Sequence, residues 1–390
     1  MKAAILGTGT IAHTHAAALR SSGIDIQAVV NRHLSKAQAF GETWQVPVIT
    51  QDPSVLLADD IDCVHICTPP TLHAPMIRML LEKGKALICE KPLTLTTEEA
   101  RDLVALTENR DSICAVNFNV RYHDACQKAR KIVQTPDFGN VLLIHGTYLQ
   151  EFHALPAPPD WRYQPELAGS MRAVTEIGSH WLDLAQHLSG QRIQAVAAVF
   201  GCFHPARQLK EGLMTSLSNT SPSKQAPEDL SLTGEETPLP LPLASKPAPQ
   251  VIRIDSEDAA CVHLRFENGA IGSMVLSEVS QGRMNHLTME ITGTHRNLWW
   301  NSEEPGKLHQ AEKGSGIQTE VMAFGGGFTD SFTRLFQEVY TDIRTGKKPD
   351  ASGNASYPTF REAARIVALS NAIEASANEA GKWVTVHEPF

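Results

Sequence analysis

Several polar side chains of this 390-residue chain have types and spacings suited to proton-transfer chemistry. The apolar run Ala86–Cys89 reads as a buried strand. Glu90 and then Lys91 follow directly after it. A lysine at the carboxyl end of a parallel strand faces the crevice in which open sheets bind ligands. When it is partly desolvated, a lysine there can orient or polarise a reacting hydroxyl group. The same residue could equally be a surface lysine in a tight turn, and position alone leaves both interpretations open.

A second set of polar residues recurs at helical spacing, on the edge of an apolar helix face. Its members alternate carboxylate and imidazole: Glu176, His180, Asp183 and His187. An imidazole beside carboxylates is a natural general base near neutral pH. The alternative is a solvated polar face, and spacing alone favours that alternative.

The element that would bring such groups to a ligand begins at the N-terminus. The apolar run Lys2–Leu6 leads into Gly7-Thr8-Gly9-Thr10-Ile11-Ala12, a G-x-G-x-x-A pattern, and then into a helix-forming stretch. Gly7 permits a tight turn, Gly9 lets the backbone approach a pyrophosphate, and Ala12 lets the helix pack on the sheet. The free N–H groups of the helix N-terminus then bind phosphate. The turn predicts a dinucleotide site, whose expected contacts are Gly7, Gly9, Thr10 and Ile11.

The end of the next strand, Ile24–Val30, indicates which dinucleotide binds. An acidic residue there would bind the ribose 2′-hydroxyl of NAD(H), whereas an arginine can accommodate the 2′-phosphate of NADP(H). The sequence has Asn31 and Arg32 at this point and no acid. It therefore favours NADP(H) and leaves NAD(H) open.

The elements that must position these groups fall into two parts. The first part alternates strands and helices, which indicates a parallel, doubly wound sheet. After about residue 140 most apolar runs read as strands, which indicates a largely antiparallel sheet. Helices are expected at 176–188, 328–344 and 357–375. We therefore expect an α/β fold, with a dinucleotide-binding domain at 1–122 and a second domain at 123–390. At least one late helix is expected to pack back on the first domain.

One segment differs in composition from the rest of the chain. Between Asn219 and Gln250 lie seven prolines, surrounded by serine, glutamate and lysine. Such a stretch cannot bury enough apolar surface to offset its ordering entropy. We expect an extended, mobile insertion over about residues 207–250.

Composition limits the class of protein. The chain is 42% hydrophobic and 20% charged, which is ordinary for a globular protein. Its net charge of −9 offers no basic face to a nucleic acid, and its longest clean apolar run, Ala195–Phe200, is too short to span a membrane. No metal site is expected, because His13 and His15 have no cysteine or acidic partners nearby in the sequence. Five of the seven cysteines lie in apolar runs and are expected to be buried, reduced thiols of a cytoplasmic protein: Cys63, Cys67, Cys89, Cys114 and Cys261.

Taken together, these motifs resemble those of the Gfo/Idh/MocA oxidoreductase family. The resemblance covers nearly the whole chain and rests on the glycine turn, Thr68–His73, Cys89–Leu93, Asn119–Arg121, Trp161–Arg162 and Glu176–Asp183. The branch that contains levoglucosan, sugar and cyclitol dehydrogenases is similar in three further stretches, Gly146–Gln150, Trp161–Gln164 and Ala168–Ser170.

The resemblance implies a Rossmann domain, a second α/β domain with a large open sheet, and a homodimer or homotetramer formed through that sheet. It implies NAD(P)-dependent oxidation of a ring CH–OH group in a sugar, cyclitol or sugar derivative. The alternatives on the same fold are a glycosidase with tightly held NAD and a non-catalytic nucleotide or sugar sensor. Glu176 departs from the family, which has an aspartate there. The extra methylene moves the carboxylate by about a bond length, a shift large enough to alter activity.

The resemblance also implies roles for individual residues. The catalytic group would be Lys91, Glu176 and His180. In it His180 takes a proton, Lys91 orients the hydroxyl and Glu176 positions them. Beside the glycine turn, the cofactor would contact Asn31, Arg32, Thr68, Pro69, His73, Glu90, Lys91, Asn119, Trp161 and Arg162. The substrate would contact Lys91, Arg121, Tyr148, Glu176 and His180.

Overall fold

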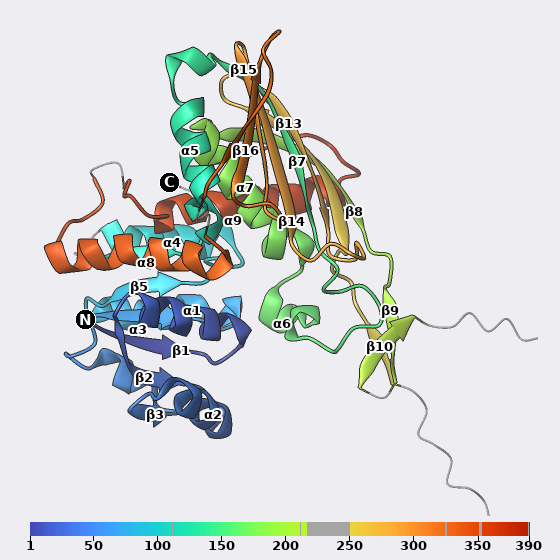
Figure 1. Cartoon of the computed structure of the whole chain (residues 1–390). Coiled ribbons are helices and arrows are strands. Elements are labelled where there is room, and N and C mark those ends of the chain that lie inside the picture. Colours follow the sequence, from blue (N-terminus) through green and yellow to red (C-terminus); the bar gives the residue numbers. More distant parts are fainter. Residues whose placement is uncertain are drawn as a thin grey trace, which may run out of the picture.

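The computed structural model describes residues 1–108, 110, 112–210, 212–216, 250–323, 326–350, 353–388 and 390. Figure 1 shows a parallel sheet and a large open sheet, with helices packed between and around them, and a small third sheet to one side. Within the described part, no helix is both long and apolar enough to cross a bilayer.

The N-terminal part forms a parallel sheet of six strands. Across the sheet their order is β3 (Val48–Thr50), β2 (Asp25–Val30), β1 (Lys2–Leu6), β4 (Cys63–Ile66), β5 (Ala86–Cys89) and β6 (Cys114–Val116). Every neighbouring pair is parallel. The winding direction reverses between β1 and β4, so the carboxyl ends of these two strands open the crevice in which doubly wound sheets bind ligands.

Alternate residues of β1 face two different helix layers. Ala3 and Ile5 pack with α1 (Thr10–Ser21), α2 (Leu34–Trp44) and α8 (Phe328–Thr345). Ala4 and Leu6 belong to the larger core, which includes α3 (His73–Glu82) and α4 (Thr97–Glu108). The late helix α8 therefore lies on the parallel sheet beside α1 (Figure 1).

The second part forms a mixed, mostly antiparallel open sheet of nine strands. Their order is β17 (Gly316–Val321), β16 (Lys307–Glu312), β15 (Arg296–Asn301), β14 (His286–Gly293), β7 (Val141–Leu149), β13 (Ile271–Ser277), β12 (Ala259–Phe266), β8 (Ile193–Gly201) and β18 (Val384–Thr385). Among the described residues only β7 and β13 of this sheet pair in parallel. These two sheets confirm the expected α/β fold class.

Helices cover one face of the open sheet, as Figure 1 shows: α5 (Asp124–Val133), α7 (Ser179–Ser189) and α9 (Phe360–Asn378). Burial along β12 alternates accordingly, with Val262 and Leu264 buried on the covered face. Cys261 points to the other face and is exposed, so the expectation that it is a buried thiol was wrong. The apolar run that suggested burial is a strand with only one covered face.

A small sheet lies within the range expected to be an insertion. In it β9 (Ala206–Lys210) pairs with β10 (Leu213–Ser216) and β11 (Gln250–Arg253). The fully buried Arg207 anchors it, because its Nη2 lies 2.8 Å from Asp258 Oδ1 and its Nη1 donates to the Tyr163 hydroxyl at 3.0 Å. The mobile insertion expected over about residues 207–250 is therefore wrong for residues 207–210 and 213–216, which are strands of this sheet. Residues 211 and 217–249 of that range lie outside the described residues.

Short helical turns complete the connections. They are η1 (Pro53–Leu57), η2 (Pro70–Leu72), η3 (Asn119–Tyr122), η4 (Pro136–Phe138), η5 (Trp161–Tyr163), α6 (Pro165–Ala168) and the π-helical η6 (Val174–Gly178). The turn α6 contacts η2 next to the carboxyl ends of β1 and β4, so the two parts of the chain meet at the crevice.

Candidate active site

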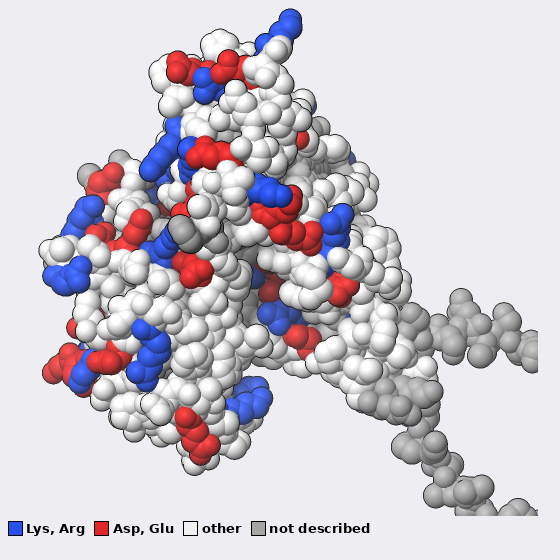
Figure 2. Space-filling model, in the orientation of Figure 1, with Lys and Arg blue, Asp and Glu red and all other residues white. Residues whose placement is uncertain are grey.

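The two sheets meet at a recess in the molecular surface. Figure 2 shows both basic and acidic side chains in this recess, between the part built on the parallel sheet and the part built on the open sheet. The predicted site residues come to it from both parts.

The glycine turn has the geometry that a dinucleotide requires. Gly7 has φ +100°, and a Cβ added to it would lie 2.5 Å from the carbonyl oxygen of Cys67. Gly9 caps α1 without a side-chain hydrogen bond, and a Cβ there would meet nothing within 4 Å. The next residues, Thr10 and Ile11, begin the helix with N–H groups free to bind an anion. Thr68 Oγ1, on the neighbouring loop, is buried without a hydrogen-bond partner. This open cradle and orphaned hydroxyl fit a dinucleotide.

The end of β2 carries positive charge and no carboxylate. Asn31 is held in place, since its Nδ2 donates to Thr8 Oγ1 at 2.7 Å and its Oδ1 accepts from the His33 N–H at 2.8 Å. Arg32 and Lys36 are exposed beside it. An exposed arginine at this position can reach a ribose phosphate.

The centre of the recess is an ionic cluster at the carboxyl end of β5. Lys91 Nζ donates to the Glu176 carbonyl oxygen at 2.8 Å and lies 3.4 Å from Glu176 Oε2. Arg162 Nε donates to the same Oε2 at 2.9 Å. Burial opposes ionisation of Glu176, but Lys91 and Arg162 outweigh it and hold its pKa well below the usual range. The carboxylate is therefore charged and oriented by two cations.

Glu176 lies in a π-helical turn, not in the regular helix that its spacing predicts. The turn η6 covers Val174–Gly178 and continues into α7. Such a wide turn breaks the usual ladder of backbone bonds and is common at functional sites. Here it brings the Glu176 carbonyl oxygen within reach of Lys91. The predicted solvated face is also wrong, because Glu176 and His180 are half-buried and Asp183 is buried.

His180 lies next to this cluster. Its ring centroid is 5.9 Å from that of Phe118 and 6.5 Å from that of Tyr148, and its Nδ1 is buried without a hydrogen-bond partner. Burial, followed by the positive charge of Lys91, lowers the pKa of His180 to about 3. The imidazole is therefore neutral at physiological pH and able to accept a proton.

Two amides that the sequence analysis missed complete one wall of the recess. The Tyr148 hydroxyl donates to Asn285 Oδ1 at 2.7 Å, and Gln150 Nε2 donates to the same oxygen at 2.8 Å. Gln150 follows β7 and Asn285 precedes β14, so they are far apart in sequence. No spacing could have paired them.

The turn η5 and Asp160, which precedes it, supply another wall of the recess. The Arg162 guanidinium lies over the Trp161 ring, with 4.6 Å from Cζ to the ring centroid. Asp160 holds the other side of the guanidinium through Nη1, at 3.2 Å. Stacking and pairing fix Arg162 against Glu176.

Three predicted cofactor residues are tied into the framework around the crevice. Both ring nitrogens of His73 meet backbone carbonyls, at 2.9 Å from Thr68 O and 2.9 Å from Pro92 O. Glu90 is buried against other side chains of the parallel sheet, and Asn119 Nδ2 donates to Ser331 Oγ at 2.8 Å. These side chains hold the loops in place, and Pro69, which precedes η2, belongs to one of those loops.

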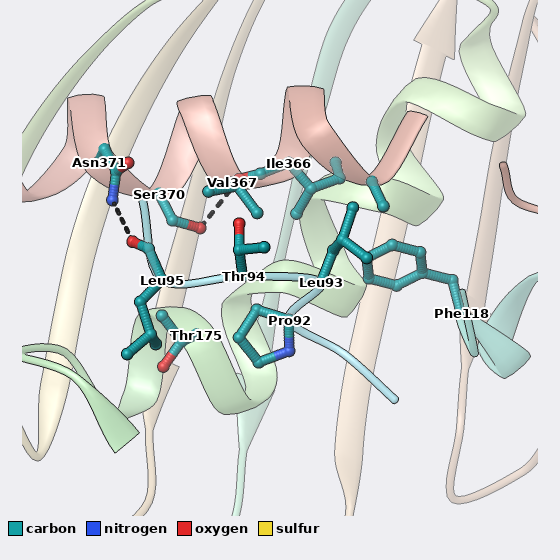
Figure 3. Close-up of a pocket in the computed structure, with 11 residues that line it drawn as sticks. Pro92, Leu93, Thr94, Leu95, Phe118, Thr175, Ile366, Val367, Ser370 and Asn371 are labelled. Carbon is teal, nitrogen blue, oxygen red and sulfur yellow. Dashed lines mark hydrogen bonds between the residues drawn. The ribbon is translucent and has the colours of Figure 1, made fainter. Parts of the chain in front are cut away.

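Behind the Lys91 turn, residues 92–95 pack under α9, as Figure 3 shows. Leu93 and Phe118 lie toward the helix, and Asn371 Nδ2 donates to the Leu95 carbonyl oxygen at 3.2 Å. The small cavity between them is lined mainly by apolar side chains, and its polar lining includes Thr175, the residue before Glu176. It belongs to the packing that fixes Lys91.

Arg121, predicted to bind substrate, is paired with two carboxylates in this structure. Its Nε and Nη2 form a bidentate pair with Asp183, at 2.7 and 2.5 Å, and its Nη1 lies 2.9 Å from Glu362 Oε1. Only 6% of Arg121 and 2% of Asp183 is exposed. This ion pair joins η3, α7 and α9, which makes it part of the structural core.

Replacing Asp183 with asparagine is therefore expected to destabilise the fold. Removing one partner from a buried ion pair costs about 3–5 kcal/mol. Here Arg121 would lose its bidentate partner and keep only Glu362, which it meets through Nη1 alone. The measurement is the free energy of unfolding by denaturant. The control is Asp102→Asn, which breaks an exposed pair with Arg78 and is expected to cost less than about 1 kcal/mol. Equal effects of the two substitutions would contradict the structural role of Asp183.

Among the described residues, no group of three or more His, Cys, Asp or Glu side chains could hold a metal ion. The recess offers a lysine, an imidazole and a carboxylate, together with the glycine cradle.

Both parts of the chain match models of known protein domains. Residues 1–118 match a family model described as "Oxidoreductase family, NAD-binding Rossmann fold", and residues 126–299 match the "GFO/IDH/MocA C-terminal domain". Levoglucosan dehydrogenase of Pseudarthrobacter phenanthrenivorans is 30% identical over 355 residues, which cover 85% of this chain and 82% of that protein.

One further relative and one solved structure extend the comparison. Inositol 2-dehydrogenase of Rhizobium meliloti is 30% identical over 195 residues, half of this chain and 56% of that protein. A solved structure of levoglucosan dehydrogenase in complex with NADH superposes with a TM-score of 0.82 at 25% identity, covering 100% of this chain and 99% of that one.

Proposed function

Because the chain belongs to the Gfo/Idh/MocA oxidoreductase family, we propose that it is a dehydrogenase that oxidises a ring hydroxyl of a sugar, cyclitol or sugar derivative. The observation that carries this proposal is the ionic cluster of Lys91, Glu176 and Arg162 beside the neutral ring of His180. Relatives named as dehydrogenases of levoglucosan and inositol support the substrate class.

Each part of the chain has its own task in this proposal. Residues 1–122 form the dinucleotide domain, and residues 123–390 supply the substrate wall and the assembly surface. The glycine turn, Thr68 and the end of β2 would hold the cofactor. When bound, the nicotinamide supplies the redox chemistry by accepting hydride from the carbon that bears the hydroxyl.

The side chains of the recess divide the proton chemistry between them. His180 takes the hydroxyl proton, and its low basicity means that the alkoxide needs stabilisation as it forms. Lys91 provides that stabilisation, because an ammonium has three N–H donors and Glu176 occupies only two of them. Glu176 positions Lys91, while the Tyr148, Gln150 and Asn285 group orients other hydroxyls of the ring. With a glutamate here, the carboxylate reaches both Lys91 and Arg162.

A spectrophotometric screen tests the proposal directly. Sugars and cyclitols are offered with NAD⁺ and with NADP⁺, and reduced cofactor is followed by absorbance. We expect turnover with at least one polyol. Release of nitrophenol from nitrophenyl glycosides without net cofactor reduction would point to a glycosidase. Cofactor binding with no turnover on the whole panel would point to a sensor.

The end of β2 supports a preference for NADP(H), and a single substitution tests it. Arg32→Ala is expected to weaken NADP(H) binding about tenfold or more, the scale of one hydrogen bond to a charged group, with little change for NAD(H). Fluorescence titration with both reduced cofactors gives the two Kd values. Arg78→Ala, a surface arginine of α3, is the matched control. Equal loss for both cofactors would reject the role of Arg32.

We also propose that the uncovered face of the open sheet forms a homo-oligomer. Val199, Cys261 and Val275 are neighbours across β8, β12 and β13, and all are exposed. With Ile271 they form an apolar surface, of the kind that marks interaction sites. Among the described residues, helices lie only on the opposite face (Figure 1).

Val275→Arg should therefore shift the protein toward monomer in light scattering at fixed concentration, because it places a charge in an apolar interface. Val251→Arg, an exposed apolar residue of the small sheet, is the control and should leave the assembly unchanged. An unchanged mass for Val275→Arg would reject this surface.

A cytoplasmic location completes the proposal. The seven cysteines are all free thiols, and five of them are buried in the core. Free thiols persist where the compartment keeps them reduced.

A further inference from the structure

A chain of buried polar side chains lies between the parallel sheet and the helices α1 and α8. His15 Nε2 lies 2.8 Å from Glu90 Oε1, and His15 Nδ1 lies 2.9 Å from His65 Nδ1. His65 Nε2 lies 3.0 Å from the Tyr340 hydroxyl. Both imidazoles are fully buried, and Glu90 and Tyr340 are nearly so. Each of these links is short enough to be a hydrogen bond.

This chain of hydrogen bonds connects elements that are distant in sequence. His15 lies on α1, the helix that begins at the glycine turn, and His65 lies on β4 in the middle of the sheet. Tyr340 comes from α8, which packs beside α1 (Figure 1). Glu90 is the residue before Lys91. The chain therefore joins the dinucleotide turn and a late helix to the residue next to Lys91.

Aromatic packing isolates the chain from water. The Phe336 ring centroid lies 5.0 Å from that of His15 and 4.7 Å from that of His65, and Phe332 packs edge-on to His15 at 5.5 Å. In such surroundings a hydrogen bond is stronger than in water, and an unmade one is costly.

The positions of the hydrogens in this chain follow from what each group can do. Glu90 Oε1, when ionised, can only accept, so His15 Nε2 carries hydrogen. In a neutral His15 ring, Nδ1 is then the acceptor, and the His65 hydrogen must be on Nδ1. His65 Nε2 is left as an acceptor, and the Tyr340 hydroxyl donates to it. Burial lowers the pKa of His65 well below its usual value, which makes that ring neutral as this scheme requires.

We propose that Tyr340, His65 and His15 form a one-directional chain of hydrogen-bond donors that keeps the Glu90 carboxylate charged and fixed next to Lys91 and His180. This inference rests on the proposed dehydrogenase function for its catalytic consequence, but the direction of the chain does not. Asn117 completes the arrangement, since its Nδ2 donates to Glu90 Oε1 at 2.6 Å. Tyr340, His65, His15 and Glu90 are positioning residues in this scheme.

The charge of Glu90 acts on groups that face it from several elements. Burial alone would raise its pKa, but the hydrogen bonds from His15 and Asn117 and the charge of Lys91 lower it. Its charge in turn opposes the loss of basicity of His180. The titratable groups around it are His15 from α1, Cys67 after β4, His73 from α3, Cys89 of β5, Lys91, and His180 from α7.

The catalytic consequence concerns the positive charge that appears when His180 takes a proton. Lys91 disfavours that charge, and a fixed carboxylate behind Lys91 favours it. Without the donor chain, Glu90 would lose its bond from His15 and keep only that from Asn117, so its charge would be less well fixed. The chain should therefore act on kcat more than on substrate binding.

The first experiment measures the direction of the chain without any substrate. Long-range ¹H–¹⁵N correlation spectra of the full-length protein, with ¹⁵N-labelled histidine, report which ring nitrogen is protonated. We expect hydrogen on Nε2 of His15 and on Nδ1 of His65, with assignments from His15→Gln and His65→Gln. A doubly protonated His15, or hydrogen on Nε2 of His65, would overturn the proposal.

The second experiment uses matched substitutions of His15 with the polyol found in the screen. His15→Leu removes the donor, and we expect kcat to fall about tenfold or more, the scale of one hydrogen bond to a charged group, with KM nearly unchanged. His15→Gln keeps an N–H near the position of Nε2 and should restore most of kcat. Glu90→Gln should lower kcat at least as much as His15→Leu.

The outcomes separate this inference from the proposed function. If no polyol is turned over, the dehydrogenase assignment fails while the spectra still decide the direction of the chain. If turnover exists and folded His15→Leu keeps kcat within about threefold, the positioning role is wrong. If His15→Leu does not fold, the comparison of Glu90→Gln with the wild-type protein gives the same test.

Discussion

Replacing Lys91 with methionine is expected to lower kcat/KM for the sugar or cyclitol substrate by about 10²–10³-fold, the usual cost of removing one donor from a developing oxyanion. Methionine keeps the length of the side chain and removes its charge and its N–H groups. The measurement is the initial rate of cofactor reduction with the polyol identified in the screen. Cofactor Kd should change little, since the dinucleotide is held by the glycine turn.

The size of this effect follows from how Lys91 is held. Its Nζ donates to the Glu176 carbonyl oxygen and approaches Glu176 Oε2, so the ammonium is fixed before a substrate arrives. The third donor is available to the substrate oxygen. A preorganised donor needs no rearrangement as the alkoxide forms. Removing this donor therefore raises the free energy of the transition state.

A lysine at the other end of the same strand provides a matched control. Lys85 precedes β5, and its Nζ donates to backbone carbonyls of Ala58 and Ile61 at 2.5 and 3.0 Å. Lys85→Met should lower stability and leave kcat/KM of the folded enzyme within about threefold of the wild-type value. If Lys91→Met also stays within that range, Lys91 does not stabilise the alkoxide.

The Lys91 substitution should also change the pH profile. Lys91 is one of the causes that lower the pKa of His180, so its removal raises that pKa. The acid limb of kcat/KM should therefore move to higher pH in Lys91→Met. A loss of rate with an unmoved acid limb would indicate that Lys91 acts on the substrate alone.

Local sequence rules were sufficient for the fold class and for the dinucleotide turn. The G-x-G-x-x-A pattern lies between a strand and a helix. Each of its small residues is required for a local steric reason, because a larger side chain would block the turn, the pyrophosphate or the packing of the helix. Gly7 shows this directly, because a Cβ there would meet the Cys67 backbone. The strand before Glu90 and Lys91 was equally readable, since central parallel strands are apolar on both faces.

Contacts between distant segments were not predictable from spacing. Arg121 and Asp183 are 62 residues apart, and nothing local distinguishes a buried ion pair from a substrate ligand. The same holds for His15, which has no cysteine or acidic residue nearby in the sequence, although its partners in the fold are His65 and Glu90. Contacts between distant residues depend on the three-dimensional fold, and they leave no regular spacing in a single sequence.

The π-helical turn at Glu176 illustrates a different limit. A helical period of 3.6 residues predicts that Glu176 and His180 share one face of a regular helix. The extra residue in the turn η6 changes that relation, and the Glu176 backbone contact with Lys91 depends on it.

His180→Asn is expected to lower kcat by about 10²–10⁴-fold, the usual contribution of a general base. Asparagine keeps a similar size and polarity but cannot take a proton at neutral pH. His187→Asn is the matched control, because His187 lies two turns later on the same helix and contacts Arg130 instead of the recess. It should keep kcat within about threefold of the wild-type value.

The pH dependence of the wild-type enzyme tests the same assignment from another side. Since the pKa of His180 is lowered to about 3, the ring stays neutral at pH 5 and above. The profile of kcat/KM reports the ionisation of the enzyme before substrate binds. We therefore expect no loss of kcat/KM from His180 protonation between pH 8 and about 5, and an inflection near 6.5 that disappears in His180→Asn would contradict this.

The lowered pKa of His180 also predicts how stability depends on pH. In the unfolded chain an ordinary histidine begins to take up a proton near pH 6.5, whereas folded His180 does so only near 3. As pH falls from about 6.5 toward 3, this one residue favours unfolding by up to about 1.4 kcal/mol per pH unit. His180→Asn removes that contribution, so the free energy of unfolding of the variant should fall less steeply over this window. Equal slopes for the two proteins would show that His180 has an ordinary pKa in the fold, and it would then be a stronger base that depends less on Lys91 to stabilise the alkoxide.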